Sequence, residues 1–111
     1  MSGPLESGLE VLRARFRERV RGDLATLNDA LDALEAGRRT AAEVHAEMRA
    51  VLHRLAGAAG SFGWPEIGTL AGTLEQELGA APDPGADPVL TAARWRAGIA
   101  ELARRTPPTG A

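Results

Sequence analysis

Apolar residues recur every three or four positions along most of this chain, which is the spacing of residues on one face of an α-helix. The first such pattern begins at Leu9 and keeps its phase across Gly22 as far as Leu34. We therefore expect one long helix there; a kink at residues 21–23, or two helices meeting at that point, are the alternatives. The pattern consists of Leu9, Leu12, Phe16, Val20, Leu24, Leu27, Leu31 and Leu34.

Both ends of this helix carry residues that favour helix termini. The sequence Ser7-Gly8-Leu9-Glu10 has the form of a capping box, in which a hydroxyl caps the helix and an acid follows three residues later. The helix should begin there, with residues 1–6 flexible. Gly37 should follow its end, because glycine readily adopts the left-handed backbone conformation found just after many helices.

A second helix is predicted to start at Thr40, which forms another capping box with Glu43. One apolar stripe then continues to about Phe62, where Gly63 should stop the helix. Pro65 suits the first position of a third helix, because the N–H that proline lacks would have no helical partner there. The second stripe consists of Val44, Met48, Val51, Leu55 and Phe62.

The rest of the chain predicts two helices separated by a loop. The third helix runs from Pro65 to about residue 78, and residues 79–85 form a loop rich in proline, glycine and alanine. Asp87 and Pro88 start the last helix, in which Leu90 falls off the apolar stripe. Residues 106–111 are expected to be a disordered tail. The inward residues are Ile67, Leu70, Ala71, Leu74 and Leu78 in the third helix, and Trp95, Ile99 and Leu102 in the fourth.

Four amphipathic helices joined by short connections can bury their stripes only against one another. We therefore predict an all-α fold, an antiparallel four-helix bundle, in which residues 7–105 form a single domain. The chain has 111 residues, enough for one modest hydrophobic core.

His53 lies about 180° around its helix from the middle of the second stripe, so it should face solvent. Exposed helix positions usually carry long charged side chains, and each glycine inside a helix costs about 1 kcal/mol relative to alanine. A helix with two glycines beside an outward histidine indicates a surface kept bare for the approach of another molecule. The neighbours of His53 on this face are Arg49, Ala50, Ala56, Gly57 and Gly60.

Composition and charge exclude several classes of protein. The chain has no cysteine, so disulfides and thiolate chemistry are excluded, and no apolar run long enough to cross a bilayer. Its net charge is −2, and acids interrupt the arginines at positions 15–21, so we expect neither nucleic-acid nor membrane binding. His45 is eight residues before His53 and about 80° around the helix from it, which does not suit a pair of metal ligands. We expect a cytoplasmic protein without a metal site.

One stretch points to a known family. The string His53-Arg54-Leu55-Ala56-Gly57 is followed by Gly63, Ile67, Leu74 and Glu75. This stretch resembles the histidine-containing phosphotransfer (HPt) domain of bacterial multistep phosphorelays. The family motif has the form His-x-Leu-Lys-Gly, with a further glycine ten residues after the histidine and an apolar residue four after that. Ala56 departs from the motif, because the family usually has lysine there.

The resemblance implies a phosphoryl carrier with an HPt-like bundle. His53 would accept a phosphoryl group from a phospho-aspartate on a response-regulator receiver domain, for example that of a hybrid histidine kinase, and pass it to an aspartate on another receiver. The receiver would supply Mg²⁺ and a lysine, so we expect no cofactor, and no kinase or hydrolase activity, of the chain itself. We expect a monomer. Receiver docking is assigned to Arg49, Ala50, Arg54, Ala56, Gly57 and Gly60, and structural roles to Gly63 and Pro65.

Several alternatives stay open. Without its surroundings, His53 would be an ordinary surface histidine. Gly57 and Gly60 would otherwise be close contacts between helices. Arg49 is hypothesised to replace part of the positive charge lost at Ala56, and its alternative role is that of a solvated residue. The departure at Ala56 also leaves open an interaction module that docks a receiver or another helical partner without being phosphorylated. A small hydrolase is disfavoured, because such a bundle offers no clear cleft.

Overall fold

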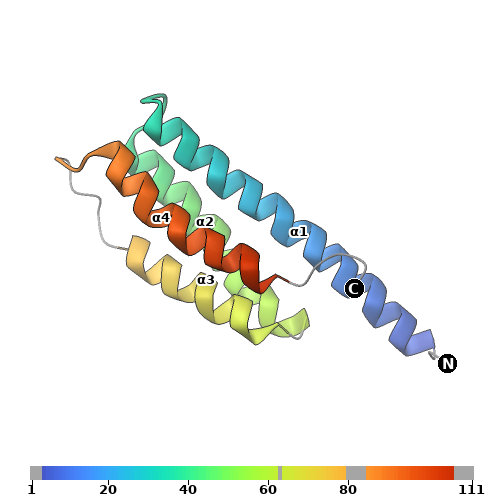
Figure 1. Cartoon of the computed structure of the whole chain (residues 1–111). Coiled ribbons are helices and arrows are strands. Elements are labelled where there is room, and N and C mark those ends of the chain that lie inside the picture. The colour runs from blue at the N-terminus through green and yellow to red at the C-terminus, as the bar shows by residue number, and fades with distance from the viewer. Residues whose placement is uncertain (1–3, 63, 80–84, 107–111) are drawn as a thin grey trace.

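A computed structural model describes residues 4–62, 64–79 and 85–106 of the chain. It contains no strand in these ranges, and its helices form an antiparallel bundle in which each neighbours the next and α4 returns beside α1 (Figure 1). The predicted all-α four-helix fold is confirmed. The elements are α1 (Pro4–Glu35), α2 (Ala41–Ala59), the short 3₁₀-helix η1 (Gly60–Phe62), α3 (Pro65–Leu78) and α4 (Pro88–Arg105).

Helix α1 is a single helix, as predicted, but its start differs from the prediction. It begins at Pro4, so Ser7 lies inside the helix and does not cap it. Proline is well suited to the first turn, where its fixed backbone angle is already helical. The capping-box pattern at Ser7 was therefore a wrong guide to the helix start.

The end of α1 follows the sequence. Gly37 has a φ of 72°, the left-handed conformation that was predicted for it. The N–H of Gly37 donates to the carbonyl of Leu34 at 3.1 Å, and the N–H of Arg38 donates to that of Ala33 at 2.9 Å. This pair of bonds is a Schellman motif, which satisfies carbonyls that the helix end would leave unpaired.

The other helix boundaries also follow from local chemistry. The N–H of Glu43 donates to the hydroxyl of Thr40 at 3.2 Å, and Pro65 is the first residue of α3, both as predicted. Asp87 accepts from the N–H of Val89 at 2.8 Å and caps α4. Helix α2 and η1 together end at the predicted residue. The predicted stop Gly63, the side chain of Phe62, most of the predicted loop (80–84) and most of the predicted tail (107–111) lie outside the described residues.

The core fills the space between the four helices. Residues predicted to face inward on α2, α3 and α4 are buried or half-buried, and Leu90, predicted to be off the stripe, is 70% exposed. The side chain of Arg96 on α4 bonds Asp32 and Glu35 on α1 and ties these two helices together. The largest fully buried side chains are Phe16, Val20, Leu27, Leu31, Val44, Met48, Leu52, Leu55, Ile67, Leu78 and Leu102.

Helix α1 extends beyond the other helices at its N-terminal end (Figure 1). It has 32 residues, whereas α2 has 19. The apolar stripe of α1 was predicted to be buried from Leu9 onward, but Leu9 is 43% exposed and Leu12 is 45% exposed. Burial begins at Phe16, whose ring packs against Trp64 with centroids 5.0 Å apart. The prediction failed at Leu9 and Leu12 because no neighbouring helix reaches that far.

Candidate functional site

His53 lies in the middle of α2 and faces solvent. Its side chain is 76% exposed, whereas its neighbours Val51, Leu52 and Leu55 are buried on the opposite side of the helix. The outward orientation derived from the apolar stripe is therefore confirmed. Nothing in the described part of the bundle covers this imidazole.

Several residues around His53 have small side chains or none. Ala50, Gly57 and Gly60 are exposed, and Ala56 is half-buried against the core. A Cβ built on Gly57 or Gly60 would meet no atom within 4 Å, so neither glycine is needed for a close contact between helices. Gly57 lies inside α2, so its cost to helix stability has no counterpart in the packing of the bundle, whereas Gly60 is the residue at which α2 ends and η1 begins.

Other glycines do serve packing. A Cβ on Gly68 of α3 would lie 3.3 Å from the carbonyl oxygen of Ala56 on α2, and a Cβ on Gly98 of α4 would collide with Leu74. Gly68 thus lets the backbones of α2 and α3 approach closely beside the histidine. Gly68 and Gly98 thus lie against neighbouring helices, whereas Gly57 and Gly60 beside His53 have open space where a Cβ would be.

Helix α3 contributes a partner for the imidazole. Nδ1 of His53 lies 2.8 Å from Oε1 of Glu75, whose side chain is 26% exposed. An ionised carboxylate can only accept a hydrogen bond, so Nδ1 carries the proton that it donates to Glu75. In the neutral ring this leaves Nε2 unprotonated, with its lone pair directed to solvent. The arrangement presents one nitrogen as a nucleophile and fixes the tautomer through the other.

The site residues assigned from the sequence did not include Glu75. The position of Glu75 along α3 indicates that it is half-buried. Its distance from His53 cannot be derived in this way, because that distance depends on how α2 and α3 align. The resemblance contained the only signal, because Glu75 was among the residues quoted for it.

Charged residues flank His53. Arg49 and Arg54 are exposed, and Arg49 makes no ion pair or hydrogen bond within the described residues. On the α1 side lies Asp23, which is half-buried. Burial raises the pKa of Asp23, and the positive charges of Arg19 and Arg54 oppose that effect.

His45 faces the core, unlike His53. It is 7% exposed, and its ring meets the edge of Trp95 with centroids 5.9 Å apart. Neither ring nitrogen has a hydrogen-bond partner, and burial lowers the pKa of His45. The two histidines therefore lie on different faces of α2. In the described ranges, no group of three His, Cys, Asp or Glu residues is placed to hold a metal ion.

Comparisons with known proteins add one finding to this geometry. The model of the Hpt domain family matches residues 11–105, which include all of α2, α3 and α4. Neither the curated proteins nor the solved structures give a significant match. Among the described residues, no helix has the length and apolar character needed to cross a membrane.

Proposed function

Because the chain belongs to the Hpt domain family, whose role is histidine phosphotransfer in phosphorelays, we propose that His53 is the residue that carries the phosphoryl group. The observation that supports this assignment is the state of the imidazole: it is exposed, Nδ1 is held by Glu75, and Nε2 is free. The only other histidine, His45, is buried and cannot reach a partner without unfolding of its surroundings.

The proposed step is a transfer between an aspartate and a histidine. Nε2 attacks the phosphorus of a receiver phospho-aspartate, so an N–P bond forms while the acyl O–P bond breaks. The aspartate leaves as a carboxylate with the electron pair of that bond. The proton stays on Nδ1, where the charge of Glu75 stabilises the positive charge that develops on the ring. In the reverse step a receiver carboxylate attacks the phosphorus and Nε2 leaves.

The receiver is proposed to dock on the face of α2 that carries His53. Reacting atoms must approach to about 3–3.5 Å, so the receiver surface has to contact the residues around the imidazole. Gly57 and Gly60 would permit that approach, and Ala50, Arg54 and Ala56 border it. Arg49 would provide charge for an acidic receiver site, because the usual lysine is absent at Ala56. Mg²⁺ belongs to the receiver in this proposal.

The decisive experiment is transfer of labelled phosphate from phosphorylated receivers. We expect an acid-labile, alkali-stable phosphate on the wild-type chain and none on His53→Ala. His45→Leu is the matched control, because it removes the other histidine and should keep the label. Labelling of His53→Ala at the wild-type level would refute the assignment.

Ala56 supports a second candidate function, an interaction module that is not phosphorylated. The same samples distinguish it. A chain that binds receivers, is never labelled, and binds equally well as His53→Ala would be such a module.

A further inference from the structure

Two arginines from different helices lie near each other beside His53. The positive charges of Arg19 on α1 and of Arg54 on α2 both act on the carboxylate of Asp23. Asp23 is half-buried, and its Oδ2 is buried without a hydrogen-bond partner among the described residues. The two arginines are exposed, and neither makes a hydrogen bond or a close ion pair in the described part of the chain. The surface therefore presents two positive groups, while the negative group near them is partly withdrawn from it.

On α2, small residues separate His53 from Arg54. Gly57 and Ala50 lie about 40° and 60° around the helix from His53, in the direction of Arg54, which is about 100° away. Both small residues are exposed. Because Arg54 acts on a carboxylate of α1, it borders this bare surface on the α1 side.

On α1, Arg19 continues the same border. It is four positions, or about 6 Å, from Asp23 toward the N-terminus of the helix. Helix α2 runs antiparallel to α1, so Arg19 is level with residues that follow Arg54, among them Gly57. A receiver that contacts Gly57 would therefore also meet Arg19. Because the axes of packed helices lie about 8–10 Å apart, Arg19 belongs to the rim of this surface and not to the reacting centre.

We propose that Arg19 and Arg54 form a docking contact for acidic side chains of the receiver, on the α1 side of His53. This inference rests on the proposed function and extends the receiver contact from α2 to α1.

The chemistry of the partner supports this contact. Mg²⁺ is held in proteins by carboxylates, and a phospho-aspartate is itself an anion, so a receiver presents negative charge around its reacting aspartate. Complementary charge at the rim of an interface mainly raises the association rate and suppresses wrong partners. Arg19 thus helps to select the receiver and takes no part in the phosphoryl transfer itself.

Transfer kinetics test the contact, with a receiver domain that labels the wild-type chain as the probe. In Arg19→Ala, the receiver concentration that gives the half-maximal transfer rate should rise about two- to fivefold at low salt, the size expected for loss of one exposed ion pair. The maximal rate should stay unchanged. The rise should shrink as salt screens exposed charges. Arg19→Lys keeps the charge and should stay near the wild type.

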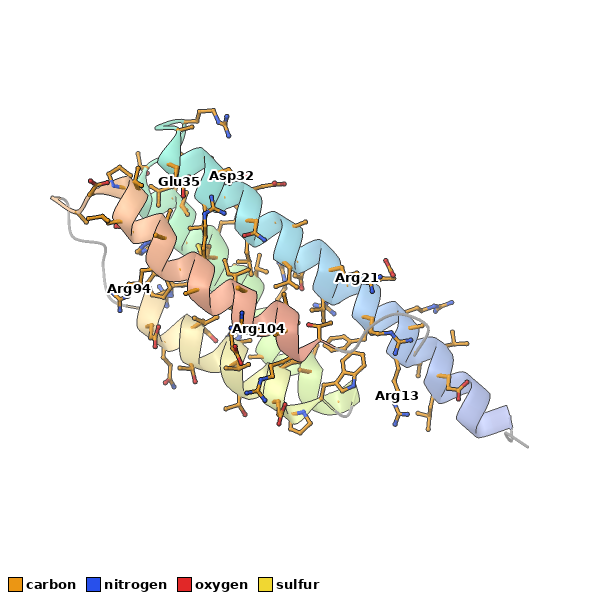
Figure 2. The ribbon with its side chains drawn as sticks, in the orientation of Figure 1. Arg13, Arg21, Asp32, Glu35, Arg94 and Arg104 are labelled. Carbon is orange, nitrogen blue, oxygen red and sulfur yellow. The ribbon has the colours of Figure 1, made fainter. Side chains whose placement is uncertain are left out.

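Arg21→Ala is the matched control, because it removes the same charge from an exposed position about 160° around α1 from Arg19. Figure 2 shows Arg21 on α1, away from α2 and α3. Circular dichroism verifies that each variant is folded. If the wild type is labelled but Arg19→Ala shows no rise, or Arg21→Ala shows an equal one, the inference is overturned and the proposed function stands. Failure of every receiver to label the wild type would instead refute the proposed function, and this inference with it.

Discussion

Nδ1 of His53 on α2 lies 2.8 Å from Oε1 of Glu75 on α3, although 22 positions separate the two residues in the chain. This contact links two helices that pack against each other, yet the His53 side chain that makes it is exposed to solvent. It has consequences for reactivity that can be measured separately from folding.

Removing Glu75 should slow phosphotransfer. Loss of a carboxylate that orients a metal-bound histidine typically costs about 10- to 100-fold, and by analogy we expect a decrease in that range for Glu75→Ala. Glu75→Gln should lose less, because the amide oxygen still accepts from Nδ1. Transfer rates and the ¹⁵N shifts of the His53 ring measure rate and tautomer. Glu77→Ala, an exposed acid on the same helix, is the control. An unchanged tautomer in Glu75→Ala would contradict this role.

Substitutions of Gly57 should affect receiver docking and helix stability differently. Because its Cβ would meet nothing within 4 Å, Gly57→Ala should stabilise α2 by up to about 1 kcal/mol in urea unfolding. Gly57→Leu should also fold but should transfer phosphate much more slowly, since the side chain would occupy the surface on which we propose that the receiver docks. Ala97→Leu, at an exposed position of α4, controls for added surface bulk. Wild-type transfer by Gly57→Leu would argue against docking on this face.

Arg49 should act through charge. Arg49→Ala is expected to slow transfer at low ionic strength, and the difference from wild type should shrink as salt screens exposed charges over distances of about 10 Å. Arg94→Ala on α4 removes the same charge elsewhere. If both variants respond alike, net charge and not position is responsible.

His45 should make the bundle sensitive to acid. Burial lowers its pKa, whereas the unfolded chain protonates this residue near the ordinary value of 6.5. Below that pH the unfolded state binds a proton that the folded state does not bind. The free energy of unfolding therefore falls as the pH decreases, with a slope of at most about 1.4 kcal/mol per pH unit. The loss continues until the pH reaches the folded pKa. Urea unfolding at pH 7.5 and 5.5 should show a smaller difference in His45→Leu; an identical difference would rule out His45 as the cause.

Asp23 should change the stability of the bundle with pH in the direction opposite to His45. Burial raises its pKa above the ordinary value of 3.8, so the folded state favours the protonated carboxyl, and this contribution to stability is lost as pH rises through the folded pKa. Asp23→Asn should therefore be more stable than wild type at pH 7, and the gain should disappear below pH 3.8. Unfolding at both pH values measures it. A variant less stable at pH 7 would mean that attraction to Arg19 and Arg54 outweighs burial.

Helix identity and the exposure of His53 could be predicted because both depend on angles within one helix. Contacts between helices could not. The pairing of His53 with Glu75 depends on the alignment of α2 with α3, and the exposure of Leu9 depends on α1 being longer than its neighbours. His45 lies within about 60° of the buried residues Met48 and Leu52 around α2, so its inward orientation follows from helix spacing, but its contact with Trp95 of α4 does not.

The start of α1 shows a different limit. Two start signals compete there, a capping box at Ser7 and a proline at position 4, and local chemistry alone does not rank them. At Thr40 a single signal was present, and the prediction was right.

Gly68 has a consequence for how an encounter with a receiver proceeds. Because Gly68 has no side chain, the α3 backbone lies close to the carbonyl of Ala56, and the helices that bear the imidazole and its carboxylate pack tightly beside each other. In the proposed transfer, a receiver would meet an imidazole whose orientation is already set by Glu75, so little of the binding energy would go into rearranging it. In that proposal, the same surface would serve the donor receiver and the acceptor receiver in turn without a change of shape.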